Sequence, residues 1–419
     1  MDGRLEIRPL GPDDDIEAEL ALRRRAFGPI TAADEKTWVA SLPAIVEAGQ
    51  VLGVFDGPRL VASARYYPMR QWWHGRSMPM AGVAGVKVAP EQRGRGIGRE
   101  LMTRLLADLV AAGYPLSTLY PSTLPLYRLF GWENAGGLYE TVLPAQALTA
   151  LGQPDADASG SRGAPGSPGS PGSSGSPGSP GAAGLRQASA ADAAAVVEVL
   201  GRVHQVLRDN GPNTREPAEV ADWLDDVDHF AYLAHDGFLS YHWADGHQEV
   251  EVEYLVAASP ATEREFWQIL GSHATMAGRI RACLAPDNPV RWLIADPNVV
   301  TSRTETWMLR LIDPAQAIAA RGYPAGAEFS VTVKLTDRAL PANSGQFTLE
   351  IRAGAGQLAP VSGRPGGPAL RVGARGLAAL FAGVPLVTLR AAGLVAGDSD
   401  ADDALDAAFG GPAYMYDYF

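Results

Sequence analysis

The chain has 419 residues, 46% of them hydrophobic and 20% charged, and a formal net charge of −12 at pH 7. This length exceeds what one core organises, so we expect two or three globular domains. The acidic balance disfavours a nucleic-acid partner, which needs a basic face. It would suit a cationic substrate, or serve only solubility.

The chain also lacks the signals for export, membrane insertion and disulfide formation. Its first ten residues, MDGRLEIRPL, are charged and have no apolar core for a signal peptide. No run of about 18 apolar residues indicates a membrane helix. The single cysteine, Cys283, excludes an internal disulfide and provides no cysteine cluster for zinc. We therefore expect a cytoplasmic protein with no membrane partner and no metal.

The first 151 residues predict an α/β layer fold. Residues 18–28 and 98–112 have the apolar spacing of helices. Strands are expected at residues 5–10, 51–56, 60–73 and 80–90, and the last three can form an antiparallel meander.

Residues 152–184 are rich in Gly-Ser-Pro triplets and read as a flexible linker without internal structure. After it, residues 185–304 weakly repeat the first layout: a strand, a helix, three strands within 230–257, a helix at 263–276 and a strand at 290–296. Residues 305–419 have a different texture and predict a third, α+β domain that ends in the aromatic segment PAYMYDYF.

The most informative stretch is GVKVAPEQRGRGIGRELM, residues 85–102. A strand ends there in a glycine-rich turn that opens an amphipathic helix, and the free N–H groups of a helix start favour a phosphate. The arginines flanking the turn add forked donors for phosphate oxygens. The turn lacks the Gly-Lys-Ser/Thr ending of a P-loop, and it follows the fourth strand rather than the first strand of a dinucleotide fold.

The pattern Arg93-x-x-Gly96-x-Gly98 after a V-x-V strand resembles the acetyl-coenzyme A signature of the GCN5-related N-acetyltransferases. By this resemblance Val86, Lys87 and Val88 would hold the pantetheine arm. The pyrophosphate would meet Gly94, Arg95, Gly96, Ile97, Gly98 and Arg99, and the far side of the cofactor would meet Ser122 and Thr123.

A second cluster, LPLYRLFGWENA, resembles the segment in which these acetyltransferases carry a tyrosine proton donor. The matching residue is Tyr127. A phenol keeps its proton at neutral pH and can give it to the departing thiolate. The alternative is that Tyr127 only packs in the core.

An acetyltransferase domain, a degenerate second copy and a C-terminal α+β domain together resemble the enhanced intracellular survival family, whose third domain is similar to sterol carrier proteins. The supporting stretches are RRAFG, VKVAPEQRGRG, LYRLFGW, MLRLID and DDALDAAFGGPAYMYDYF. The resemblance implies a hexamer that acetylates amines with acetyl-CoA as cosubstrate, including amines of aminoglycosides. The second copy replaces the glycine turn with ASPATEREFW, so we expect no cofactor there.

The family resemblance also assigns the base to the α-carboxylate of the final residue, here Phe419. An α-carboxyl group is a weak base, so we expect it mainly to orient the amine and collect its proton, directly or through water. His74, the sole histidine before the linker, lies in a strand connection and is expected at the surface. Asp34, Glu35 and Trp38 would line an acidic, aromatic-edged pocket for a polyamine, or simply form a solvated helix start.

The leading hypothesis is an N-acetyltransferase that transfers acetyl groups directly to primary amines of polycationic small molecules. Acetylation of protein or peptide lysines is the enzymatic alternative, and a non-enzymatic lipid-binding or interaction protein is the alternative from another class.

Overall fold

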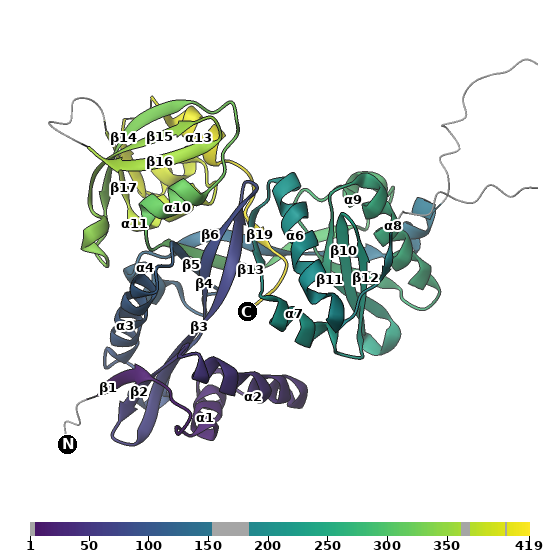
Figure 1. Ribbon diagram of the computed structural model, residues 1–419, viewed down its shortest axis with the longest axis horizontal. Coiled ribbons are helices and arrows are strands. Elements are labelled where there is room, and N and C mark those ends of the chain that lie inside the picture. The colour runs from purple at the N-terminus through teal and green to yellow at the C-terminus, as the bar shows by residue number, and fades with distance from the viewer. Residues whose placement is uncertain (1–4, 153–183, 362–368, 399) are drawn as a thin grey trace, which may run out of the picture. The chain divides into compact units, whose positions relative to one another are not determined.

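The computed structural model describes residues 5–152, 184–361, 369–398 and 400–419 (Figure 1). They form two compact units that are not contiguous in sequence. The first unit combines Met1–Leu138, Arg208–Arg215 and Glu305–Phe419, and the second combines Tyr139–Leu207 with Glu216–Thr304. The expected linker falls almost wholly outside the described residues, and the domain limits at 151, 184 and 304 stay predictions.

The first unit contains a twisted sheet with helices packed on it. Its spatial order is β1 (Glu6–Pro9), β2 (Val51–Asp56), β3 (Arg59–Trp73), β4 (Arg76–Val88), β5 (Leu116–Leu119), β13 (Val300–Leu311) and β6 (Glu133–Pro144). The helices that accompany it are α1 (Ile16–Phe27), α2 (Ala32–Glu47), α3 (Ile97–Ala111) and α4 (Leu124–Leu129). Strand β6 passes from the first unit into the second after Leu138.

Local sequence accounts for the main elements of this sheet. Strands β2, β3 and β4 form the predicted antiparallel meander. The long hairpin of β3 and β4 reverses at His74 and Gly75, which both have positive φ as the mirror-image hairpin turns require. In α3 the apolar residues at three- and four-residue spacing are the buried ones, among them Leu101, Leu105 and Leu109.

Strand β13 joins this sheet from a distant part of the sequence. Met308–Leu311 pair antiparallel with Leu116–Leu119 of β5. Trp307, Met308, Leu309 and Leu311 of β13 are almost fully buried. The expected third domain therefore supplies a strand to the sheet of the first.

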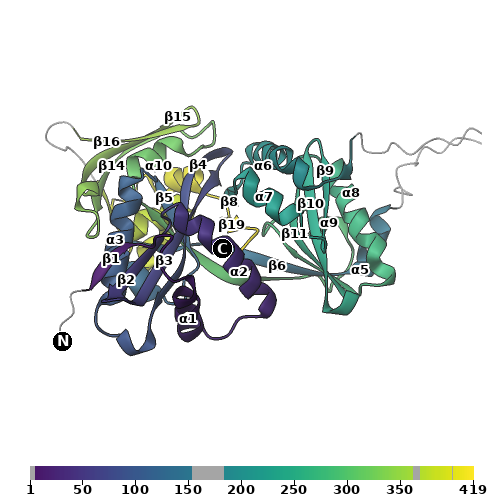
Figure 2. The same cartoon turned by 60° about the horizontal axis from the view of Figure 1, so that its bottom comes forward.

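A second, five-stranded sheet lies in the same unit, with helices packed against it (Figure 2). Its order is β16 (Ala355–Pro360), β15 (Gly345–Arg352), β14 (Phe329–Thr336), β17 (Ala369–Gly373) and β18 (Val395–Gly397). Its helices are α10 (Pro314–Ala320), α11 (Ala374–Phe381), α12 (Leu386–Ala391) and α13 (Asp402–Phe409). Trp73 from the long hairpin packs edge-on against Trp307 and Phe381, so the two sheets share one core.

The second unit repeats the layout more loosely. From the far end of β6 its strand order is β12 (Arg279–Cys283), β11 (Glu249–Ala257), β10 (Gly237–Ala244), β9 (His229–Ala234) and β7 (Arg186–Gln187). Its helices are α5 (Ala145–Leu148), α6 (Ala193–Leu207), α7 (Pro217–Leu224), α8 (Pro260–Gly271) and α9 (Val290–Leu293). Residues 210–214 leave this unit as β8 (Asn210–Thr214), which pairs with β3 in the first.

The predicted strand at residues 290–296 is wrong. Its first four residues form the helical turn α9, because Pro289 precedes them and the Asn288 side chain accepts a hydrogen bond from the Val290 amide. The strand beside β11 is instead β12, which pairs with it in parallel. A short apolar run does not by itself distinguish a strand from a buried helical turn. Within the described ranges, none of the helices combines the length and apolar character that crossing a membrane requires.

Candidate functional site

Strands β4 and β5 diverge after four paired residues. Met80–Val83 pair in parallel with Leu116–Leu119, and β5 ends there. Strand β4 continues to Val88 while still paired with β3, and an extra residue forms a bulge at Gly85, whose φ is 58°. Within the described residues no strand pairs with the β5 side of Val86–Val88, so this backbone edge is available to an extended ligand.

The glycine-rich turn lies at the end of this open edge. Gly96 is in the left-handed conformation at the N-cap of α3, and none of the described side chains caps the helix. Gly94 and Gly96 both have positive φ and are exposed. A side-chain carbon added to Gly98 would lie 3.6 Å from Val88 Cγ2 and 3.8 Å from Leu126 Cδ2. The start of α3, the end of β4 and helix α4 therefore meet at one place.

The Lys87 side chain points away from solvent into a buried ion pair. Its Nζ lies 2.6 Å from Glu19 Oε1 on α1, and the two side chains are only 2% and 1% exposed. Ser63 Oγ donates to the other Glu19 oxygen at 3.1 Å. Burial lowers the pKa of Lys87, and the Glu19 carboxylate opposes that shift. Lys87 therefore ties β4 to α1 through its side chain, and what remains at the open edge is its backbone.

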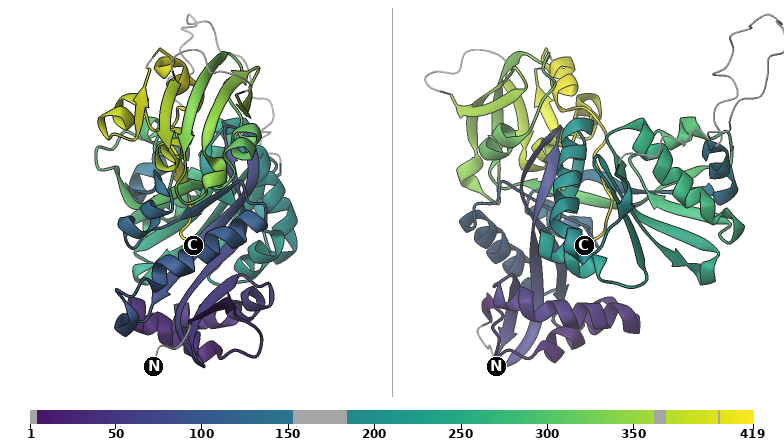
Figure 3. Two further views of the ribbon diagram at one scale, coloured as in Figure 1. Left: turned by 90° about the vertical axis from the view of Figure 1, so that its left-hand side faces the viewer. Right: turned by 45° about the vertical axis from the view of Figure 1, so that its right-hand side comes forward.

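The C-terminal segment is a strand rather than a frayed end. Tyr414 and Met415 form β19, which pairs in parallel with Gly137 and Leu138 of β6. Ala413 forms a bridge with Asn210, the first residue of β8. Tyr414, Met415 and Tyr416 are 5% exposed or less. In the right-hand view of Figure 3 the yellow segment returns from the five-stranded sheet toward the long hairpin.

Two further contacts fix the last residues. Tyr120, directly after β5, donates its hydroxyl to the carbonyl oxygen of Asp417 at 2.8 Å. Arg215 donates from Nε and Nη2 to the Asp417 carboxylate at 3.0 and 2.8 Å. The Tyr120 ring lies 4.4 Å from that of Tyr418 and 5.4 Å from that of Phe419. The last residue therefore lies beside the point where β4 and β5 separate.

The Phe419 ring lies against Gly82 of β4. A side-chain carbon at Gly82 would be 2.8 Å from Phe419 Cε2, so the glycine makes room for this ring. Gly82 is one residue before the last paired residue of β4, Val83. The terminal residue thus contacts the strand that carries the open edge.

Tyr127 lies near the same segment. It is on α4, is 4% exposed, and forms a hydrogen bond with the Ser122 side chain. Burial raises the pKa of Tyr127 to about 12, the Ser122 hydrogen bond opposes the rise, and nearby Tyr418 adds to it. The Tyr127 proton is therefore retained across the neutral and moderately alkaline range. Ser122 and Thr123 themselves are exposed at the turn between β5 and α4.

The residues expected to line an amine pocket are more dispersed. Glu35 on α2 pairs with Arg24 of α1, Trp38 is buried at 8% exposure, and the side chain of Asp34 lies outside the described part. Their role stays a prediction. His74 occupies the β3–β4 turn, and Tyr120 and Arg215 belong to no motif that sequence alone would single out.

Comparison with known families matches three models along the chain. An acetyltransferase (GNAT) domain matches residues 6–135, a second acetyltransferase (GNAT) domain matches 211–311, and a sterol carrier protein domain matches 314–416. These matches confirm the predicted fold class: two acetyltransferase folds in tandem followed by a sterol-carrier-like domain.

Whole-chain relatives agree with this order. A crystal structure of a GCN5-related N-acetyltransferase from Kribbella flavida is 39% identical, with a TM-score of 0.87, and the match covers 99% of this chain and 98% of that one. An uncharacterized N-acetyltransferase from Streptomyces griseus is 26% identical over 388 residues, 84% of each chain. N-acetyltransferase Eis from Mycobacterium tuberculosis is 25% identical over 357 residues, 83% of each chain.

The backbone of Tyr414 in the C-terminal segment lies close to Gly211, and this contact gives a prediction about stability. Gly211 has a φ of 100°, and an added side-chain carbon would lie 2.6 Å from the carbonyl oxygen of Tyr414 and 2.9 Å from its nitrogen. We expect Gly211→Ala to lower the free energy of unfolding by about 1–3 kcal/mol more than Gly113→Ala. Gly113 has a φ of 75° with nothing within 4 Å, so it controls for backbone strain alone. Equal urea midpoints for the two variants would contradict the tight passage.

Proposed function

Because the chain belongs to the GCN5-related N-acetyltransferases and has the domain order of the enhanced intracellular survival family, we propose that it uses acetyl-CoA to acetylate primary amines of polycationic small molecules, above all aminoglycosides. That the chain is an acetyltransferase follows from its family, which argues against the non-enzymatic alternative. The observation that carries the proposal is the meeting of four features: the open edge of β4, the uncapped start of α3, Tyr127 and the C-terminal residue.

The residues present fit acetyl-CoA. The unpaired backbone of Val86–Val88 would hold the pantetheine as an added strand. The N–H groups at the start of α3, with Arg95 and Arg99 exposed beside them, would bind the pyrophosphate. Acetyl-CoA supplies an activated acetyl group as a thioester, which an amine can take up directly.

Two groups of the chain would handle the protons. Tyr127 would hold its proton at the hydroxyl and give it to the departing sulfur, because its pKa lies far above neutral pH. The Phe419 carboxylate would orient the ammonium group of the acceptor and collect its proton, directly or through water. Tyr120 and Arg215 would keep this carboxylate in place through their bonds to Asp417.

The net charge of −12 supports a polycationic acceptor, since an acidic protein attracts cations. We further propose that the protein works in the cytoplasm. The family resemblance implies a homohexamer, and light scattering on the purified full chain would test this assembly.

A panel of acceptors tests the substrate class. We expect release of free thiol from acetyl-CoA with aminoglycosides at a kcat/KM at least about tenfold above that with linear polyamines or lysine peptides. Mass spectrometry of the products should show one or more added acetyl groups on amine nitrogen. A preference for lysine peptides would favour the protein-acetylation alternative. If no thiol were released with any of these amines, the proposal would be overturned.

Tyr127→Phe tests the proton donor. The substitution removes the hydroxyl but keeps the buried ring, so we expect kcat to fall about 100-fold or more with acetyl-CoA binding unchanged. In the unaltered enzyme a donor with a pKa of about 12 stays protonated as the pH rises, so Tyr127 should cause no loss of kcat between pH 8 and pH 10. Full turnover by the variant at saturating substrates would rule out the assignment.

Phe419 is tested by two variants that separate its carboxylate from its ring. Deletion of Phe419 shifts the terminal carboxylate back by one residue, and we expect kcat to fall at least about 100-fold with folding and acetyl-CoA binding intact. Phe419→Leu keeps the carboxylate in place and should retain most of kcat. If both variants were equally active, or equally inactive, the carboxylate would not be the base.

A further inference from the structure

The second unit contains a cluster of metal-ligating side chains that the acetyl-transfer site does not use. We propose that His229, His242 and Glu253 form a binding site for a divalent d-block cation, with Zn²⁺ as the best match. Their ligand atoms all lie within 4.8 Å of one another, and this is the one such group found among the described residues.

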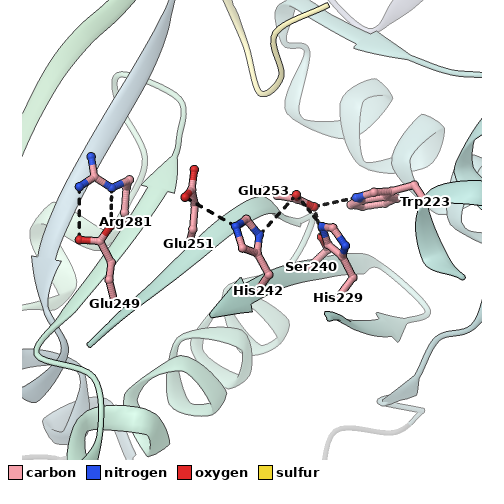
Figure 4. Close-up of polar contacts among 8 residues, drawn as sticks. All are labelled: Trp223, His229, Ser240, His242, Glu249, Glu251, Glu253 and Arg281. Carbon is pink, nitrogen blue, oxygen red and sulfur yellow. Dashed lines mark hydrogen bonds and ion pairs between the residues drawn. The ribbon is translucent and has the colours of Figure 1, made fainter. Parts of the chain in front are cut away.

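Three neighbouring strands bring these residues together. His229 on β9 is directly opposite His242 on β10, so their side chains share a face of the sheet. Glu253 lies on β11 at a bulge: Tyr241 pairs with Val252 and Ser240 with Tyr254, which leaves Glu253 as the extra residue. Bulges redirect side chains, and this one aims the carboxylate at the histidine pair (Figure 4).

Both histidines present one ring nitrogen to the same oxygen. His229 Nε2 lies 2.7 Å and His242 Nδ1 3.5 Å from Glu253 Oε1. Around a tetrahedral ion with bonds of about 2.0–2.1 Å, neighbouring ligand atoms are about 3.3 Å apart. The two distances bracket that value, so small side-chain shifts would admit an ion.

Each histidine also has a carboxylate near its second ring nitrogen. The other ring nitrogen of each histidine faces a carboxylate: His229 Nδ1 lies 3.4 Å from Asp226 Oδ2, and His242 Nε2 lies 3.6 Å from Glu251 Oε2. Metal-bound histidines commonly have a carboxylate behind the ring, which fixes the tautomer and increases ligand basicity.

Glu253 is held in the same manner. Its Oε2 accepts hydrogen bonds from Trp223 Nε1 at 2.8 Å and from Ser240 Oγ at 3.0 Å, which leaves Oε1 turned toward the histidines. A hydrogen-bonded network without metal would explain the contacts of Glu253. It would not require both histidines to converge on one oxygen with a carboxylate behind each ring.

The chemistry of the ligand set selects the ion. Two imidazoles and one carboxylate suit Zn²⁺ and related d-block cations, whereas Mg²⁺ and Ca²⁺ prefer oxygen ligands alone. The His229 and His242 side chains are 16% and 30% exposed, and that of Glu253 is 27% exposed. Solvent or an external ligand could therefore take the fourth position, as in open zinc sites.

Zinc binding to the tag-free full chain tests the site. After chelator treatment and dialysis, titration with ZnCl₂ against a competing indicator should show one tight site per chain, and MgCl₂ should show none. Glu253→Gln keeps an oxygen for Trp223 and Ser240 but loses the anionic ligand, so zinc affinity should fall at least about tenfold. His229→Gln should have the same effect. His235→Ala removes an exposed histidine of the same unit, with a side chain 75% exposed, and should bind as the unaltered chain does.

Circular dichroism and thermal unfolding of each variant show whether the fold is kept. If His229→Gln failed to fold, the near-isosteric Glu253→Gln would decide the question. Absence of stoichiometric zinc binding, or unaltered affinity in a folded Glu253→Gln variant, would overturn the proposal. Loss of binding in His235→Ala would also do so, because the ion would then be held elsewhere.

Discussion

The position of the C-terminal residues depends on one backbone interaction, the parallel pairing of Tyr414 and Met415 with Gly137 and Leu138. A tail of aromatic side chains could pack against many surfaces, whereas this pairing places Tyr414 opposite Gly137 and Met415 opposite Leu138. Two glycines permit it: side-chain carbons at Gly136 and Gly211 would come within 2.3 and 2.6 Å of the backbone oxygens of Ala413 and Tyr414. Because the tail is held on both sides, the bonds from Tyr120 and Arg215 act on a segment already in place.

The parts of this site that sequence predicted are those whose chemistry is local. The glycine turn and the helix after it are contiguous, and so is the segment around Tyr127, so spacing alone suggested their conformation. Arg215 is different. It reaches the tail because β8 leaves the second unit to pair with β3, and residue spacing does not report such a crossing. The wrong strand at 290–296 has a related cause, since its few apolar residues do not determine their own conformation.

The cluster of His229, His242 and Glu253 also could not be predicted from the sequence, for a geometric reason. His229, His242 and Glu253 lie on three different strands, and the two hairpins that join these strands bring the side chains together. Local searches for zinc sites depend on ligands a few residues apart on a turn or helix, and here a cysteine count suggested no metal. The decisive feature is the bulge at Glu253, which adds one residue to β11. Alternation of polar and apolar residues predicts a strand well, but it does not predict where its register shifts.

The insertion of β13 between β5 and β6 has a consequence for how the chain is made. Strand β5 is complete early in synthesis, yet its partner Met308–Leu311 emerges only after the entire second unit has been translated. Until then the nascent first domain exposes an unpaired strand edge, a template for wrong pairing. In the second unit β9 to β12 are consecutive in sequence and each pairs with the next, so these strands can form before β13 is made. During translation the order of folding would therefore differ from the order of the sequence, with the first domain among the last parts to be completed.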